Sequence, residues 1–437
     1  MARIIDIKAR EILDSRGTPT IETVIFLDNG IFTGASVPSG ASTGKHEAFE
    51  LRDSDKARYK GKGVLKAIDN IQNKILPLIK DIDVTKQKDI DAKMIEADAT
   101  SNKSNFGANS ILSVSLACAR GASLSLQMPL YKYINLLSHS GKPRLNRGAS
   151  RIPGGSWTSQ DDSTAVTPMF NIINGGLHGS GNLSFQEFLL IPDKSKSYSQ
   201  SLQMGAELYQ EIKTYLKENK LNYSVGDEGG FTPNLRDNEK VLDLLREIID
   251  SSKYKYGVDV HLGLDLAASQ YYKISCYHVL KHDNKGFDSH TYIDYLEKLQ
   301  KEYSFFSLED PLAEDDWDSW IALTAKIGDK TKIIGDDLLV TNRERLNKAI
   351  KLQAANSVLI KVNQIGTLTE TLEVIRRAKE ANFTVIISHR SGETNDDFIA
   401  DLAVGVSADL VKFGAPARGE RVAKYNRLGQ IYEELRI

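Results

Sequence analysis

The sequence has little cysteine, almost no net charge and no long apolar run, and each shortage excludes a class of protein. Only Cys118 and Cys276 occur among 437 residues, too few for a disulfide framework, so we expect reduced thiols. The 56 Lys and Arg nearly balance the 58 Asp and Glu. The sequence has no stripe of basic residues, so we expect no nucleic-acid partner. No run could span a bilayer, and "MARIIDIKAR" lacks a signal-peptide core. The cytoplasm is therefore the expected compartment.

The chain is long enough for two domains and changes character near residue 140. Residues 1–139 predict an α+β domain that contains a hairpin, with "DNG" at 28–30 as its turn, followed by long helices. Residues 140–166 are rich in Gly, Ser, Pro and Asp without periodicity, so we expect a polar linker or exposed loop. Residues 167–437 form the second predicted domain.

A strand-and-helix rhythm dominates that second domain. Short apolar runs end in polar residues, and amphipathic helical patterns lie between most of them. After Glu309 the run ends recur roughly every 25 residues, as strand-plus-helix units of a (β/α)8-type barrel do. A doubly wound open sheet would give the same alternation, but functional-looking residues at the strand ends favour the barrel. These strand ends are Asp265, Glu309, Asp336, Lys361, His389 and Lys412.

Three successive strand ends carry single carboxylates, Asp265, Glu309 and Asp336. Glu309 directly precedes Asp310, and two adjacent acids at the end of a buried strand repel each other unless a cation lies between them. Each acid alone could be a helix cap, but strands ~5 Å apart would bring all three to one point. Oxygen ligands without cysteine or clustered histidine suit Mg²⁺ or Mn²⁺ rather than zinc.

Lysines end two later strands, at Lys361 and Lys412. A lone lysine is usually a solvated surface group, but "VLIKV" places Lys361 in a buried strand. Facing a cation and a second lysine, Lys361 is expected to have a lowered pKa. A neutral amine accepts protons, so metal and amine together predict removal of a proton next to a carboxylate, the pattern described for enolase-superfamily sites.

Long sequence blocks lie in both domains and extend over nearly the whole chain: "LDSRGTPTIE", "PSGASTGKHEAFELRD", "NIINGG", "GDEGG", "SLEDPLAEDDW", "VLIKVNQIGTLTET", "ISHRSGET" and "GAPARGER". In these blocks and in their order, the chain resembles the enolase family (phosphopyruvate hydratases). That resemblance implies reversible dehydration of 2-phospho-D-glycerate to phosphoenolpyruvate in the cytoplasm, by a homodimer or higher homo-oligomer that uses two Mg²⁺ per active site, with Mn²⁺ as a possible substitute.

The resemblance also implies a role for each candidate residue. The three acids hold one Mg²⁺, and Ser42, on a mobile loop, reaches the second. Lys361 removes the C2 proton, and Glu228 protonates the departing C3 hydroxyl with help from Glu187. The remaining implied contacts are Arg390 and Ser391 to phosphate, Lys412 to carboxylate, Gln186 to substrate, and His178 and His389 as pocket histidines, His389 in catalysis.

Two other functions would leave different residues. An acid-sugar dehydratase of the same superfamily would keep the acids but not "PSGASTG" or the pair Arg390-Ser391, and both are present. A catalytically inactive interaction protein should have lost Lys361, Glu228 or an acid, and none is lost. The chain departs from the usual family pattern in its longer 140–166 segment and in "GGLHGSGNLSFQEF", which differs around His178.

Overall fold

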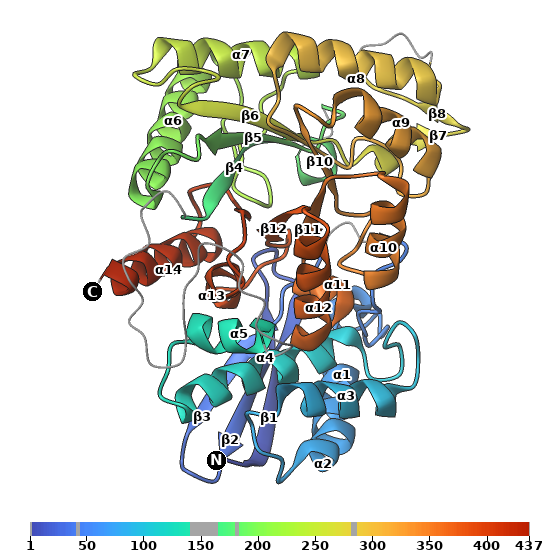
Figure 1. The fold of residues 1–437 in the computed structure, drawn as a ribbon, viewed down its shortest axis with the longest axis vertical. Helices are drawn as coiled ribbons and strands as arrows, with labels where there is room; N and C mark the ends of the chain where they lie inside the picture. Colours follow the sequence, from blue (N-terminus) through green and yellow to red (C-terminus); the bar gives the residue numbers. More distant parts are fainter. Residues whose placement is uncertain (1, 41–43, 140–164, 180–182, 281–285, 437) are drawn as a thin grey trace.

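The structure is a computed structural model that describes residues 2–436 except 41–43, 140–164, 180–182 and 281–285. It has two parts, a smaller N-terminal part below and a larger barrel above in Figure 1. Most of the segment predicted as a linker, 140–166, lies outside the described residues, as does part of "GGLHGSGN".

The N-terminal part is an antiparallel sheet covered by helices. The sheet order is β1-β2-β3, and the predicted hairpin is confirmed: β2 pairs with β3 across a turn in which Gly30 has φ +83°, a conformation that glycine adopts without steric cost. The long helix α4 lies against β2 and β3 and is buried over most of its length. The elements are β1 (Ile4–Leu13), β2 (Pro19–Leu27), β3 (Phe32–Ser36), α1 (Leu65–Asn70), η2 (Ile71–Ile75), α2 (Leu76–Ile79), α3 (Gln87–Asp98), α4 (Ala108–Ser125) and α5 (Leu130–His139).

The larger part is a closed eight-stranded barrel, which confirms the predicted fold and excludes the open sheet. Its strands follow the order β10-β11-β12-β13-β4-β5-β6-β9. β5 runs antiparallel to both neighbours, whereas the other pairings are parallel. The predicted strand-helix repeat therefore holds only from β6 onward. The strands are β4 (Thr167–Asn174), β5 (Glu187–Pro192), β6 (Val260–Asp265), β9 (Ser307–Glu309), β10 (Lys332–Gly335), β11 (Ser357–Ile360), β12 (Thr384–Ser388) and β13 (Leu410–Gly414).

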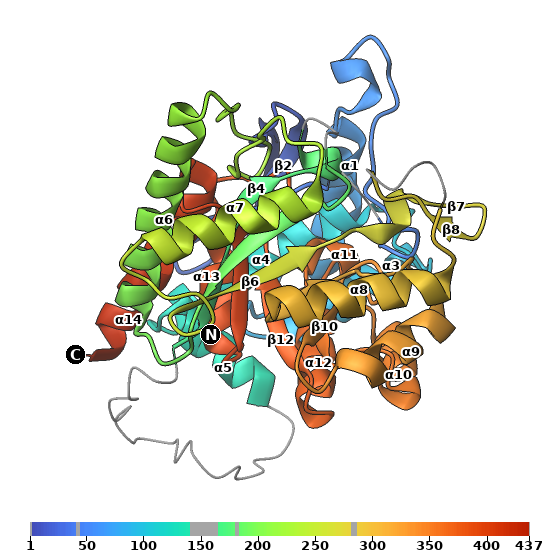
Figure 2. The ribbon, with the colours of Figure 1, turned by 90° about the horizontal axis from the view of Figure 1, so that it is seen from above.

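Helices surround this barrel in Figures 1 and 2. Several begin at a side chain that accepts a backbone N–H of the first turn, among them Ser197, Asp288, Asn342 and Thr367; such caps stabilise helix starts. The helices are α6 (Tyr198–Glu218), α7 (Asn238–Ser251), α8 (Ser289–Tyr303), α9 (Trp317–Ile327), α10 (Arg343–Leu352), α11 (Val362–Ile365), α12 (Leu368–Glu380), α13 (Phe398–Gly405) and α14 (Gly419–Arg436). Short elements are η1 (Tyr59–Gly61), η4 (Gly176–His178), η5 (Ala268–Gln270), β7 (Tyr272–Lys273) and β8 (Cys276–Tyr277).

The N-terminal part contributes directly to one end of the barrel. Ser39 exchanges two backbone hydrogen bonds with Gly392, in the loop after β12, at 2.7 and 2.9 Å. Farther along the interface, Asp91 of α3 accepts hydrogen bonds from the Thr369 backbone N–H at 3.0 Å and from its hydroxyl at 2.5 Å. The segment that leads to Ser42 is thus held beside the strand ends, although Ser42 itself lies outside the described residues.

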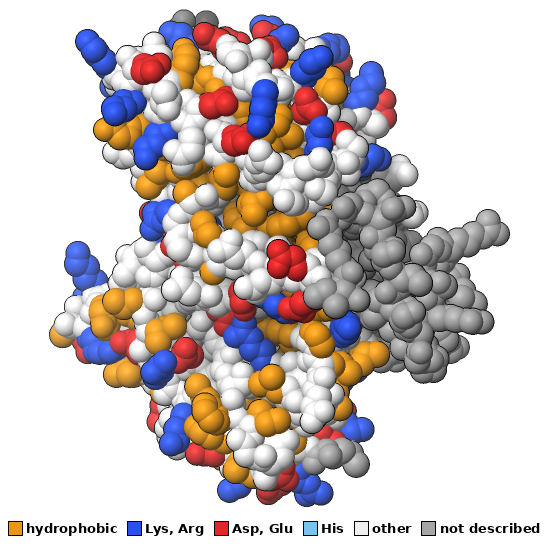
Figure 3. All heavy atoms as spheres, turned by 90° about the vertical axis from the view of Figure 1, so that its left-hand side faces the viewer, with side chains coloured by type: hydrophobic (Ala, Val, Ile, Leu, Met, Phe, Trp, Pro, Cys, Tyr) orange, Lys and Arg blue, Asp and Glu red, His pale blue; other side chains and the backbone are white. Residues whose placement is uncertain are grey.

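Charged side chains are mixed by sign on the face shown in Figure 3, where Lys and Arg alternate with Asp and Glu. This mixing fits the nearly balanced composition, and that face shows no stripe of one sign.

Within the described residues, no single helix is long and apolar enough to cross a membrane. Only α4 and α5 taken together meet the length and composition criteria, and they are bent by 106° at the break between them.

Candidate active site

The period-two alternation of the strands decides which side chains enter the mouth of the barrel. A separate apolar cluster fills the interior and includes Leu359 of β11, Ile334 of β10 and Leu410 of β13. Two residues farther along each strand, the same inward direction is taken by Lys361, Asp336 and Lys412. β5 runs the opposite way, so its first residue, Glu187, reaches the same mouth, where it pairs across the sheet with Asp265.

The lysine of β13 holds three of the buried carboxylates together. Lys412 Nζ lies 2.8 and 2.9 Å from the two Glu309 oxygens, 3.2 Å from Asp265 Oδ2 and 3.0 Å from Glu187 Oε2. Burial acts to lower the pKa of Lys412, but Asp265 and Glu187 raise it well above its usual value. The positive partner that the sequence requires beside Glu309 is thus supplied in this structure by Lys412.

The predicted lowering of the Lys361 pKa is not what the structure shows. Burial does act in that direction, but the ammonium group forms an ion pair with Asp336, which raises the pKa above the ordinary value of 10.5. The expectation assumed that the Asp336 carboxylate would be neutralised by another cation.

The three predicted metal ligands fit a hard divalent cation in chemistry. Asp265, Glu309 and Asp336 are buried at the ends of neighbouring strands β6, β9 and β10 and offer only oxygen atoms. Burial, followed by repulsion from Asp265, raises the pKa of Glu309 well above its usual value, which shows a local excess of negative charge. Lys412 bonds to two of these acids and Lys361 to the third, so a metal ion would compete with ammonium groups for the same oxygen atoms.

A further acid, Asp310, directly follows Glu309, and the sequence alone assigned it no function. It lies with Asp336 and Asp337 in a closely spaced group of carboxylates. Its own oxygens accept the backbone N–H groups of Asp336 at 3.0 Å and Asp337 at 2.7 Å, so Asp310 fixes the loop that carries a candidate metal ligand. Such roles leave no periodic signal in a sequence.

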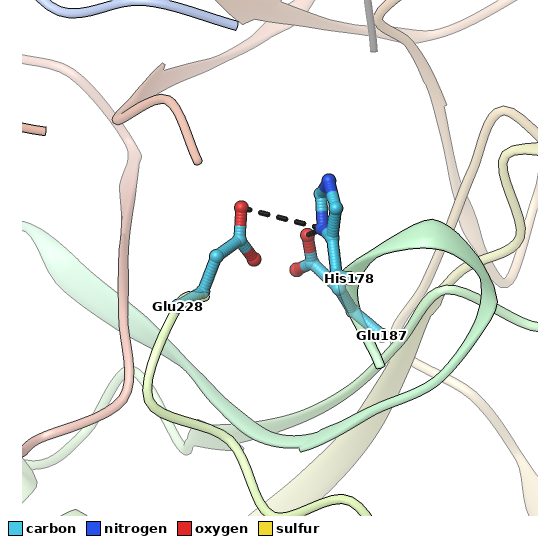
Figure 4. Close-up of side chains that lie close together, drawn as sticks. All are labelled: His178, Glu187 and Glu228. Carbon is cyan, nitrogen blue, oxygen red and sulfur yellow. Dashed lines mark ion pairs between the residues drawn. The ribbon is translucent and has the colours of Figure 1, made fainter. Parts of the chain in front are cut away.

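A second buried cluster contains both predicted acids and both histidines. His178 Nδ1 lies 3.5 Å from Glu187 Oε1 and 3.4 Å from Glu228 Oε1 (Figure 4). His389 Nε2 lies 3.7 Å from the same Glu228 oxygen, and Asn171 Nδ2 donates to the other Glu228 oxygen at 2.7 Å.

The two carboxyl groups of this cluster differ in their affinity for protons. Burial and then the charge of Glu228 raise the pKa of Glu187 to about 7. Burial would also raise the pKa of Glu228, but His178 and then His389 hold it well below its usual value. Burial acts to lower the pKa of His178, yet the two carboxylates raise it to about 10. Near neutral pH, Glu187 therefore holds a proton more readily than Glu228.

The loop that carries Glu228 depends on its glycines. A Cβ on Gly226 would lie 2.3 Å from the His178 carbonyl oxygen, and one on Gly230 would lie 2.7 Å from Asn174 Oδ1. Gly229 has φ +90°, which disfavours other residues. These close approaches bring Glu228 against His178.

The predicted phosphate-binding arginine has a partner that the sequence did not identify. Arg390 Nη1 donates to Glu47 Oε2 at 2.9 Å and to Asn363 Oδ1 at 3.0 Å. Glu47 belongs to the quoted block "PSGASTGKHEAFELRD", just after Ser42, so this ion pair connects that segment with the loop after β12. A contact between residues so distant in the sequence could not be inferred from spacing.

Most of the candidate residues line one small cavity of about 20 Å³. This is room for about one water molecule, so the lining side chains must move before a larger molecule can enter. Glu309 and Asp336 contact the cavity-lining Lys412 and Lys361 instead of lining the cavity themselves. The lining comprises His178, Gln186, Glu187, Glu228, Asp265, Lys361, Ser388, His389, Arg390, Ser391 and Lys412.

Together, the fold and the site describe an eight-stranded barrel with carboxylates, lysines and histidines gathered around one cavity. Two family models match the chain: "Enolase, C-terminal TIM barrel domain" over residues 163–436 and "Enolase, N-terminal domain" over residues 4–134. The chain belongs to the enolase family. Membership indicates a lyase that acts on a small molecule, and the buried acidic groups could bind a metal ion.

Proposed function

We propose that the protein reversibly dehydrates 2-phospho-D-glycerate to phosphoenolpyruvate. The observation that carries this proposal is the shared cavity: Lys361 lines it from the end of β11, and the cluster of His178, Glu187 and Glu228 lines it from other elements. An amine base and a proton-donating carboxyl group are the two functions that a β-elimination needs.

In this proposal each group acts on one part of the substrate. Lys361 accepts the C2 proton, and the Glu187–Glu228 pair supplies a proton to the C3 hydroxyl. The raised pKa of Glu187 makes it the member of the pair that holds this proton in the structure, and Glu228 is its route to the hydroxyl. Arg390 and Ser391 bind the phosphate.

The metal contributes charge. Asp265, Glu309 and Asp336 would hold one Mg²⁺, or Mn²⁺ in its place, and a second would involve Ser42. When bound, the ions would supply positive charge that offsets the charge developing on the substrate carboxylate. Lys412, beside the same acids, orients that carboxylate.

The test follows phosphoenolpyruvate formation by its ultraviolet absorbance, with 2-phosphoglycerate and with acid sugars, before and after chelation. Activity with 2-phosphoglycerate that disappears on chelation and returns with Mg²⁺ is expected. Full activity after exhaustive chelation, or turnover of acid sugars only, would refute the proposal. A homodimer and a cytoplasmic location remain predictions, which sedimentation and cell fractionation would check.

A further inference from the structure

A fully buried arginine of α14 connects the two loops of the site. Arg421 Nη1 donates to the Arg390 carbonyl at 2.6 Å, and Nη2 donates to the Asp227 carbonyl at 2.9 Å and the Ser391 carbonyl at 2.6 Å. Nη1 also lies 2.7 Å from His389 Nδ1. One guanidinium group therefore contacts the loop of Glu228, the phosphate-binding loop and a ring nitrogen of His389.

The chemistry of arginine decides which nitrogen of His389 carries the proton. A guanidinium group has only donors and does not lose its charge in proteins, so Nδ1 must accept this hydrogen bond with its lone pair. A proton on Nδ1 would face the arginine N–H and place two cations in contact inside the protein. Burial lowers the pKa of His389 well below its usual value, with Arg421 adding to that effect against the opposing charge of Glu228. The neutral ring then has its hydrogen on Nε2.

The other nitrogen faces the cavity. His389 Nε2 is buried, has no hydrogen-bond partner within the described part of the chain, and lies 3.7 Å from Glu228 Oε1. His389 itself lines the cavity. Its N–H is therefore a donor without an acceptor at the place where the proposed substrate would bind.

The backbone nearby leaves room for this contact. A Cβ on Gly414 would lie 2.9 Å from Arg421 Cδ and 3.0 Å from His389 Cε1, and Gly414 has φ +90°. Only a residue without a side chain lets the arginine and the imidazole approach each other here.

We propose that Arg421 is a positioning residue that fixes His389 as the neutral Nε2–H tautomer, so that His389 donates a hydrogen bond to an oxygen of the bound substrate and does not carry protons. The role in substrate binding rests on the proposed function, whereas the tautomer does not. The family resemblance implies a catalytic role for His389, and this proposal limits that role to donating a hydrogen bond.

The first experiment measures the tautomer without substrate. Protein labelled with ¹⁵N-histidine is compared with His389→Gln to assign the ring signals. We expect a protonated Nε2 and an unprotonated Nδ1 for His389, unchanged between about pH 6 and pH 9, where a free histidine would titrate at the acidic end. A protonated Nδ1, or a ring that titrates in that range, would overturn the proposal. Because no turnover is measured, an error in the proposed reaction would not change this result.

The second experiment removes the arginine. In Arg421→Met, the His389 ring should titrate or change tautomer, and kcat/KM should fall about 10–100-fold, the usual effect of losing an outer partner of a site residue. Arg427→Lys is the matched control, because Arg427 lies on the same helix and pairs with Asp401; it should leave both readouts unchanged. Lost activity with an unchanged His389 tautomer would show that Arg421 only stabilises the fold.

A third comparison decides the matter if Arg421→Met does not fold. The amide nitrogen of His389→Gln can replace an Nε2–H donor, whereas His389→Leu cannot donate. His389→Gln should therefore be about tenfold more active than His389→Leu, as one hydrogen bond of about 1.4 kcal/mol predicts. Equal activities would contradict the donor role.

Discussion

The two halves of the proposed reaction can be separated by two substitutions. In that proposal Lys361 acts on the C2–H bond, and Glu228 belongs to the pair that protonates the C3 hydroxyl. Glu228→Gln should stop loss of hydroxide but leave Lys361 in place, so the variant should still exchange the C2 hydrogen of 2-phosphoglycerate with heavy water. Lys361→Ala should neither exchange nor turn over.

The expected size of the Lys361 effect follows from its neighbours. General-base catalysis contributes about 10²- to 10⁴-fold, and a replacement base would reduce that loss. Lys412 is the other lysine among the described residues that line the cavity, but its ammonium group is held by Glu309, Asp265 and Glu187, and its pKa is raised. We therefore expect Lys361→Ala to lose the upper part of that range.

The assay follows deuterium incorporation by NMR beside phosphoenolpyruvate formation. Lys103→Ala is the control, because Lys103 is also a buried lysine, paired with Glu370 at 3.0 Å in the domain interface; it should reduce stability and leave exchange within a few-fold. If Lys361 is only an electrostatic partner of Asp336, excess Mg²⁺ should restore the activity of Lys361→Ala. Such rescue, or surviving exchange in that variant, would refute the assignment of the base.

Three further predictions concern a loop acid, a loop glycine and a buried glutamate of the site. Asp310→Asn replaces an acceptor of two backbone N–H groups and should raise the Mg²⁺ concentration for half-maximal activity about 10–100-fold; an unchanged metal titration would contradict this. Gly226→Ala should cost about 1–3 kcal/mol of stability and most of kcat, because its Cβ meets the His178 carbonyl. The control Gly257→Ala has φ +73° but open space around its Cβ, so it should reduce stability alone. Equal kcat values for the two variants would refute the packing argument. Burial, then repulsion from the neighbouring glutamate, raises the pKa of Glu187 from 4.5 to about 7. The free energy of unfolding should therefore fall as pH rises from about 4.5 to about 7, by of the order of 3 kcal/mol at about 1.4 kcal/mol per pH unit. Chemical denaturation should show this fall in the wild type but not in Glu187→Gln. Parallel pH dependence of the two proteins would count against the raised pKa.

The strand-end residues were predictable because local patterns determine them. In a barrel the repeat places strand ends at one rim, and the alternation within each strand sets direction, so Asp265, Asp336, Lys361 and Lys412 could be placed from the sequence. The reversed strand β5 interrupts this rule, because a short connection without a long helix joins it to β4. The place of Glu187 in the site could therefore be inferred only from the family resemblance.

Contacts between distant segments could not be predicted in the same way. The pairing of Glu47 with Arg390, and the position of Arg421 behind His389, depend on how separate loops meet in three dimensions. The predicted direction of the Lys361 pKa shift was wrong for a related reason. Its sequence neighbours predict burial, which lowers the pKa, but Asp336 at the end of the preceding strand raises it.

The ion pair between Asp336 and Lys361 connects the proposed metal ligands with the proposed base. Four buried carboxylates meet two lysines at the mouth of the barrel, which leaves two negative charges over if all six groups are ionised; the groups are Glu187, Asp265, Glu309, Asp336, Lys361 and Lys412. Lys361 keeps its proton as long as Asp336 bonds to its ammonium group. It would accept a proton more readily when that carboxylate is bonded to another cation, because burial, Arg390 and Lys412 then act to lower its pKa against the opposing charge of Glu309. In the proposed reaction the acids would thus both hold a divalent ion and free Lys361, on the adjacent strand, to act as the base.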